Sequence, residues 1–251
     1  MKILTNEKYI ASRRRIGSIF SFAGIGVLLG GFILTFTAEE GSTLSYLSLF
    51  SLPLGWILAQ VGLYFANRLI KKPVVHEAID EGLSKLGKAG DNFHLYHYIF
   101  PANHLVLTPN GIMTIIAKYQ SGKITADEFD WKQKIGLFQR FFGQQTLGNP
   151  ASEAEYQVKQ VAKWISHHVP ELAEKELPIG SVIVFTANDV ELDVSQSAIP
   201  AVHRTKLKGF WKQRKQDRRM DEEHFNLLQA AFDAEAEKIG ASDGSDEDEE
   251  E

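Results

Sequence analysis

The stretch NHLVLTPNGIMTIIAKYQSGKI, residues 103–124, contains two short apolar runs separated by a turn sequence. The runs cover 104–108 and 112–118. Pro109-Asn110-Gly111 lies between them, and its glycine supplies the positive φ that a tight turn needs. The pattern predicts a β-hairpin. Its second strand ends on Lys118, a single cation at the end of a run that is otherwise typical of a buried strand.

The segments around this hairpin predict further strands and helices. Residues 93–100 are aromatic and rich in β-formers. Residues 181–187 are apolar throughout, which is typical of a central strand covered on both faces. A helix over 151–168 follows Asn149-Pro150, a capping asparagine and a first-turn proline. Three further segments are a short helix over 73–88, a weaker strand over 123–131 and a near-edge strand over 198–203. This order predicts an α/β fold, a mixed sheet flanked by helices.

Two uncharged apolar blocks, 16–36 and 44–65, precede this domain. A helix of about 20 residues rises ~30 Å, the thickness of the hydrocarbon core of a bilayer. A signal peptide is the alternative for the first block, but the block exceeds the ~7–15 residues of a signal core. Buried helices of a soluble protein are a second alternative, which the length and uniform apolarity of both blocks disfavour. We therefore expect a two-helix transmembrane hairpin with spans at 16–36 and 44–67, joined by an external loop at 37–43.

Positive charges flank the two spans on one side. Residues 1–15 carry five cations and residues 68–72 carry three, whereas the connecting loop carries only Glu39 and Glu40. The positive-inside rule then predicts a multi-pass protein of the cell membrane, with both termini and the main domain in the cytoplasm. Neither span contains an ionisable residue, which argues against transport or proton relay and favours an anchor in the lipid bilayer.

The composition excludes several kinds of site. The chain has no cysteine, so disulfides, thiolate zinc sites and a cysteine nucleophile are excluded. The net charge of −5 is dominated by seven acids in 243–251, and the rest of the chain is slightly basic. We expect a disordered acidic tail at 241–251, after a charged helical segment at 213–240. His94 and His97 are three residues apart on a strand and therefore point to opposite faces, which disfavours a metal site formed with His104.

A basic helix is expected over 206–219. Four of its cations fall on one face: Lys208, Lys212, Lys215 and Arg219. Three interpretations stay open. The helix can dock through its apolar side, with the cations solvated. Its cationic face can instead bind anionic lipid headgroups of the inner leaflet, or it can bind nucleic-acid phosphates.

Four segments, taken in order, resemble the core of the nuclease-related domain (NERD) family. They are the hairpin segment, Trp131, FFGQQTLGNPASEAE (141–155) and SVIVFTANDVELDV (181–194). The resemblance covers about residues 76–212, and we expect a NERD-like cytoplasmic domain over 73–212. It implies a fold related to the restriction endonucleases.

The resemblance also implies where an active site would lie. In that fold, an acidic residue and a Glu-x-Lys on the next strand hold a divalent metal and orient water. Lys118 matches the lysine. Asn103 and Ile116 stand where the two acids are expected, and neither can replace an anionic ligand of Mg²⁺. For Lys118, extension into solvent and a retained anion-binding role both stay open.

We therefore predict a membrane-anchored NERD-like domain that is catalytically inactive. It would act as a binding or scaffolding module for an unidentified protein partner, with no catalytic residue, metal or cofactor. Two alternatives stay open. One is a nuclease with a rearranged Mg²⁺ site that uses an acid from elsewhere, for example Glu153. The other is a module that binds lipid headgroups or nucleic acid through the 206–219 helix.

Overall fold

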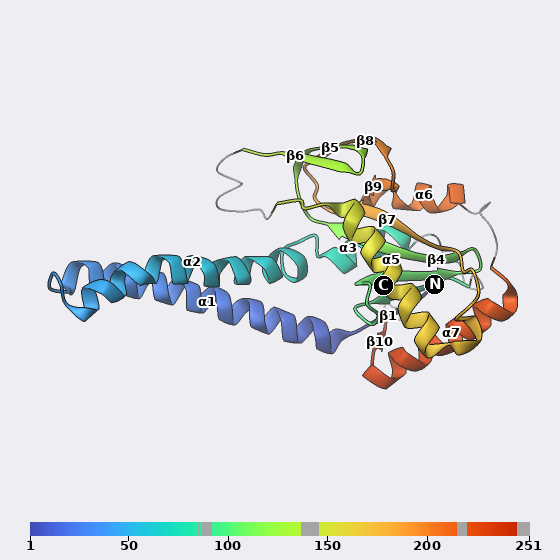
Figure 1. Cartoon of the computed structure of the whole chain (residues 1–251), viewed down its shortest axis with the longest axis horizontal. Coiled ribbons are helices and arrows are strands. Elements are labelled where there is room, and N and C mark those ends of the chain that lie inside the picture. The colour runs from blue at the N-terminus through green and yellow to red at the C-terminus, as the bar shows by residue number, and fades with distance from the viewer. Residues whose placement is uncertain (85, 87–91, 137–145, 215–219, 245–251) are drawn as a thin grey trace, which may run out of the picture. The chain divides into compact units, whose positions relative to one another are not determined.

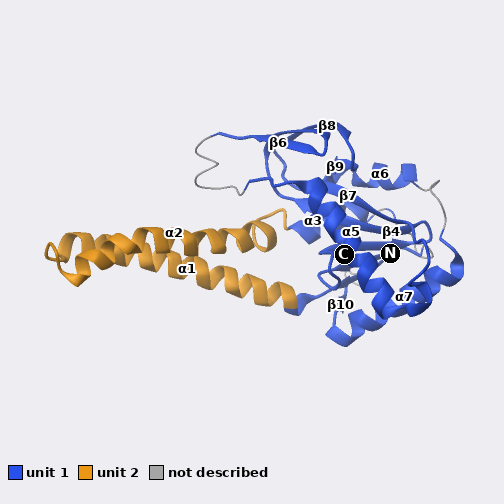
Figure 2. Cartoon of the chain, in the orientation of Figure 1, with its two compact units in different colours: residues 1–8, 75–251 blue, residues 9–74 orange. Residues whose placement is uncertain are grey.

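The computed structural model describes residues 1–84, 86, 92–136, 146–214 and 220–244. It divides into two compact units, which Figure 2 distinguishes by colour. The sheet unit comprises Met1–Lys8 and Val75–Glu251, and the apolar unit comprises Tyr9–Val74. The expected α/β class, with a mixed sheet flanked by helices and preceded by two apolar helices, is confirmed.

The apolar unit is built from two long helices, α1 (Glu7–Thr37) and α2 (Thr43–Leu69). Both are long and apolar enough to cross a membrane, although they extend beyond the predicted spans. Glycine lets them approach closely. A Cβ on Gly24 would lie 2.9 Å from the backbone nitrogen of Ala59, whereas one on Gly26 would meet nothing within 4 Å. Gly24 is therefore part of the interface between the two helices.

The sheet unit contains a seven-stranded mixed sheet in the order β10-β1-β2-β3-β4-β7-β9, and a smaller sheet in the order β6-β5-β8 (Figure 1). The strands of the large sheet are β1 (Lys2–Thr5), β2 (His94–His97), β3 (His104–Thr108), β4 (Gly111–Lys118), β7 (Ile179–Phe185), β9 (Ala201–His203) and β10 (Ser242–Asp243). Those of the small sheet are β5 (Gly122–Glu128), β6 (Asp130–Lys134) and β8 (Val190–Ser197). The helices are α3 (Val75–Leu83), α5 (Pro150–His168), α6 (Leu207–Gln213) and α7 (Glu222–Ile239), with short 3₁₀ turns at Pro170–Leu172 and Arg204–Lys206.

The predicted hairpin is present as β3 and β4, which pair antiparallel with Leu105 opposite Thr114. Gly111 has φ 132°, and a Cβ there would lie 2.4 Å from the carbonyl oxygen of Pro178, so the turn requires glycine. On its other side, β4 pairs parallel with β7 along its length, and the pairing ends with Lys118 opposite Phe185. The 181–187 segment is thus an internal strand covered on both faces, as expected, although it lies next to the edge strand β9.

Side chains alternate between the two faces of the large sheet. Ile112 and Ile116 of β4 pack beneath α5, whereas Met113 and Ile115 pack against α3 and α6. Phe232 of α7 packs in the same apolar cluster as Ile112. Helices α5 and α7 therefore cover one face, and α3 and α6 cover the other.

Three strands differ from the expectation. The 123–131 segment is not one strand but most of a hairpin, because the chain reverses between β5 and β6, and Ala126 pairs with Trp131. The 93–100 strand ends at His97, since Tyr98 adopts φ 58° and leaves the extended conformation. Of residues 198–203, only 201–203 form a strand, β9, which lies at the edge of the sheet as expected.

Three strands were not expected. One is β10, which pairs antiparallel with β1 although it lies in the segment 241–251 that we expected to be disordered. β1 lies in the segment that we assigned as a basic N-terminal extension, and it pairs parallel with β2. β8 pairs parallel with β5. β1 is a marginal local signal because it has only four residues. β8 alternates apolar and polar side chains over Val190–Val194, a strand pattern that the sequence analysis missed. Their partners in the sheets stabilise all three strands.

Candidate functional site

Lys118, the last residue of β4, is buried, with 4% of its surface exposed. Its ammonium donates to the Glu153 carboxylate (Nζ···Oε1 2.6 Å) and to the carbonyl oxygen of Leu147 (3.1 Å). The alternative that Lys118 extends into solvent is therefore wrong. The alternation along β4 places Lys118 on the same face as Ile116, and helix α5 covers that face.

The start of α5 carries Glu153 to this position. Asn149 caps the helix by accepting from the Ser152 backbone N–H (3.1 Å), and Pro150 occupies the first turn, as expected. Ala151 and Ala154 are fully buried against β4 and β7, so the small side chains let the first turn approach the sheet. Glu153 lies in that first turn, where the positive end of the helix dipole favours a carboxylate.

The structure also shows the surroundings of Ile116 and Asn103, the two positions where the acids of the family are missing. Ile116 is 2% exposed and packs in an apolar cluster with Ile183 and Phe185. Asn103 is exposed, and its backbone carbonyl accepts from the Tyr98 N–H (2.7 Å). Neither residue offers an anionic metal ligand. Within the ranges that the structure describes, no three His, Asp or Glu side chains are grouped so that they could hold a metal ion.

Two buried polar atoms belong to residues close to this pair in the fold. Gln120, two residues after Lys118, donates to the Thr146 carbonyl (3.4 Å), but its Oε1 has no hydrogen-bond partner in the described part of the chain. The same holds for Nε1 of Trp131, whose ring stacks on Phe185. Buried polar atoms normally have partners. One acceptor and one donor are thus available to a polar ligand or to water.

The basic helix is shorter than expected within the described residues. α6 covers Leu207–Gln213, and two of the four candidate cations, Lys215 and Arg219, lie outside the described residues. Leu207 and Trp211 are buried against the sheet, so the helix docks through its apolar side. Lys212 is exposed and Lys208 is half-buried.

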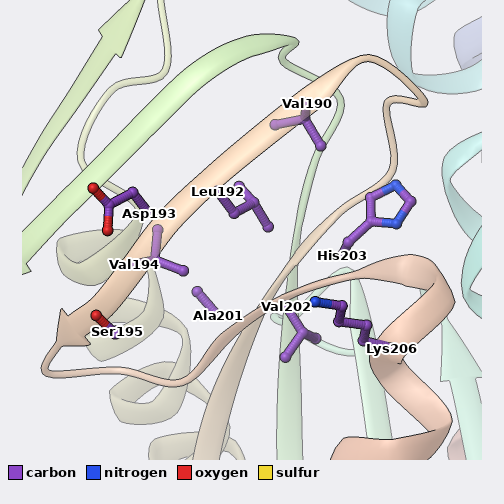
Figure 3. Close-up of a pocket in the computed structure, with 9 residues that line it drawn as sticks. All are labelled: Val190, Leu192, Asp193, Val194, Ser195, Ala201, Val202, His203 and Lys206. Carbon is purple, nitrogen blue, oxygen red and sulfur yellow. The ribbon is translucent and has the colours of Figure 1, made fainter.

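Sequence reasoning missed a separate pocket of about 400 Å³ between β8 and β9 (Figure 3). Apolar side chains such as Leu192 and Val202 line it, together with Asp193, His203 and Lys206. Its residues come from β8, which was not predicted, and from the region of β9, so no single local motif indicated it. None of them belongs to the Lys118 site.

Sequence reasoning also missed a cluster of histidines. His94 and His97 do point to opposite faces, as predicted: His94 lies near Phe225 of α7, and His97 contacts Asp80 of α3. However, His97 also contacts His104 on the neighbouring strand, with 2.7 Å between their Nδ1 atoms. No pattern in the sequence indicated the contact between His97 and His104 or the one between His97 and Asp80.

Comparison with known proteins adds one result to this geometry. A family model described as "Nuclease-related domain" matches residues 77–186. No curated protein matches the chain, and no solved structure matches it.

Proposed function

We propose, from the premise that residues 77–186 are a nuclease-related (NERD) domain, that this protein is a membrane-anchored binding module without nuclease activity. The Lys118–Glu153 ion pair carries the proposal. The lysine that would act on a phosphodiester is neutralised by the Glu153 carboxylate, and the next side chain on the same face is Ile116. Metal-dependent cleavage needs anionic ligands that hold the cation against the phosphate.

A cleavage assay tests the first part of this proposal. The full chain in detergent micelles is incubated with single-stranded and double-stranded DNA and with RNA, in Mg²⁺ or Mn²⁺, with EDTA as the blank. We expect no cleavage above that of Lys118→Ala prepared in parallel, which also controls for a contaminating nuclease. Metal-dependent cleavage that disappears in both Lys118→Ala and Glu153→Gln would instead establish a rearranged nuclease with Glu153 as a ligand.

The outer side of α6 supports a polyanion as the bound partner. Lys208 and Lys212 are one helical turn apart, and no ion pair within the described ranges involves either of them. A cationic face on a domain beside a membrane can bind anionic lipid headgroups or nucleic-acid phosphates. If it binds neither, a protein partner is the remaining candidate.

A charge-matched comparison tests this surface. The double variant Lys208→Ala/Lys212→Ala is compared with Lys159→Ala/Lys163→Ala, which removes two exposed cations at the same spacing from α5. Binding is measured by co-flotation with vesicles containing phosphatidylserine and by fluorescence anisotropy of an oligonucleotide at several salt concentrations. We expect the α6 variant to bind more weakly and with a lower salt dependence, and the α5 variant to bind like the wild type. Equal effects of the two variants would show that any exposed cations attract the polyanion, and that α6 is not a specific binding surface.

We further propose that both termini and the sheet unit lie in the cytoplasm. The cations of 1–15 and 68–72, against Glu39 and Glu40 in the loop, support this orientation. Because the chain has no cysteine, single cysteines can be introduced at Gly41 and at Thr205. A membrane-impermeant maleimide added to intact cells should label the first position and not the second. The reverse labelling would contradict the orientation.

A further inference from the structure

A chain of three titratable side chains joins α3 to the large sheet. Asp80 of α3 accepts a hydrogen bond from Nε2 of His97 (2.7 Å), and Nδ1 of His97 lies 2.7 Å from Nδ1 of His104. His97 and His104 are directly opposite on β2 and β3. The two rings are almost completely buried, whereas the Asp80 side chain is 28% exposed.

The two contacts limit how many protons the chain can hold. An ionised carboxylate only accepts, so Nε2 of His97 carries a proton. The Nδ1···Nδ1 contact needs one proton between the rings. In the neutral state, His104 donates through Nδ1. When one proton is added at Nε2 of His104, the shared proton can move to Nδ1 of His97. His97 is then an imidazolium that donates to both Asp80 and His104, and the contact is kept. A second added proton would place two N–H groups against each other, and the contact would be lost.

We propose that Asp80, His97 and His104 form an acid-sensitive latch, which holds α3 on the sheet with at most one added proton and releases it when a second is bound. α3 begins six residues after the end of α2. The latch therefore holds against the sheet the first helix that follows the apolar unit in the sequence. Release would free the nine residues of α3 and lengthen the connection between the apolar helices and the sheet.

Several other groups surround the latch, and burial and nearby histidines make a second proton unfavourable. His76, one turn before Asp80 on α3, has its ring 6.0 Å from that of His97, and Tyr98 packs edge-on at 5.0 Å from His104. Burial, together with the nearby His97 and His76, holds the pKa of His104 well below its usual value. The outer side of α3 is charged as well, and there Glu81 pairs with Arg204. Asp80 contacts the His97 ring, and His97 in turn contacts His104.

Hydrogen exchange of the full chain in detergent micelles, read by mass spectrometry, tests the latch. The opening equilibrium of α3 is measured between pH 7.5 and 5.0 and corrected for the intrinsic exchange rate. Below the unfolded pKa of about 6.5, the open state binds at least one more proton than the closed state, so opening should increase at least ~10-fold per pH unit. Protection of α5 should change much less.

Three variants give separate expectations. Asp80→Asn removes the charge that supports the first proton, so opening should rise up to ~100-fold per pH unit. His104→Phe removes the acceptor of the second proton, and the slope should fall by about one proton, that is ~10-fold per pH unit. His167→Ala changes an exposed histidine on α5 and should match the wild type.

The proposal is overturned if opening of α3 in the wild type is independent of pH, or if His104→Phe keeps the wild-type slope. The first of these outcomes needs no variant, so the test remains decisive even if His104→Phe does not fold. Neither outcome depends on what the domain binds.

Discussion

Lys118 and Glu153 are 35 residues apart in the sequence, yet their Nζ and Oε1 atoms lie 2.6 Å apart. The side chain of Lys118 is 6% exposed and that of Glu153 is 47% exposed, so the pair has one buried and one half-exposed member. A buried ammonium is costly without an acceptor. The Leu147 carbonyl supplies a second acceptor. Lys118 therefore connects β4 to the loop before α5 and to α5 itself.

Loss of the carboxylate should destabilise the sheet unit. Glu153→Gln leaves the buried Lys118 ammonium with weaker acceptors, and we expect a loss of about 1–3 kcal/mol in the free energy of unfolding. Urea denaturation of the full chain in detergent measures it. Glu155→Gln, an exposed acid on the same helix, is the matched control and should be close to neutral. If Lys118→Met in the Glu153→Gln background does not recover part of the loss, the two residues are not coupled.

Restoring acids at the two uncharged positions should create metal binding at a cost in stability. Ile116→Glu places a carboxyl in an apolar cluster, and we expect a loss on the order of 3 kcal/mol without metal. With Asn103→Asp added, Mg²⁺ should raise the melting temperature of the double variant, because binding to the folded state stabilises it. The wild type is the control. A double variant that ignores Mg²⁺ would show that the absent charges are not what disables the site.

His94 should make the sheet unit less stable in acid. Burial lowers the pKa of His94, although nearby Asp233 opposes this effect. Below the unfolded pKa of about 6.5, the unfolded chain therefore binds more protons, and stability falls as the pH falls, by up to ~1.4 kcal/mol per pH unit. His94→Phe should reduce this slope between pH 7 and 5, as measured by urea midpoints. An unchanged slope would mean that His94 does not contribute.

The glycines of α1 should be unequal in their tolerance of substitution. Gly24→Leu must displace backbone atoms of α2, because a Cβ there already lies 2.9 Å from Ala59 N. Gly26→Leu adds the same side chain to a position with open space. We expect the first change alone to open the hairpin, as measured by the mobility of the full chain on SDS gels. Equal mobilities of the two variants would contradict the packing of α1 against α2.

Local patterns in the sequence were sufficient for the elements with strong signals. The β3–β4 hairpin was predictable because Gly111 occupies a turn that requires positive φ. α5 was predictable because Asn149 and Pro150 define its start, and the two long apolar helices because length and apolarity are properties of a segment by itself. β1 was not predictable, since its stability comes from strands distant in the sequence. β8 was missed although its alternation of apolar and polar residues is a strand pattern.

The uncharged residues at 103 and 116 could also be identified from the sequence, because the type of residue at a position does not depend on the fold. Only the tertiary structure decided that Lys118 is buried against Glu153, and that Asp80, His97 and His104 form one chain. Both arrangements depend on which helix covers which face of the sheet. That choice is made by the packing of many apolar side chains together, and no short segment of the sequence encodes it.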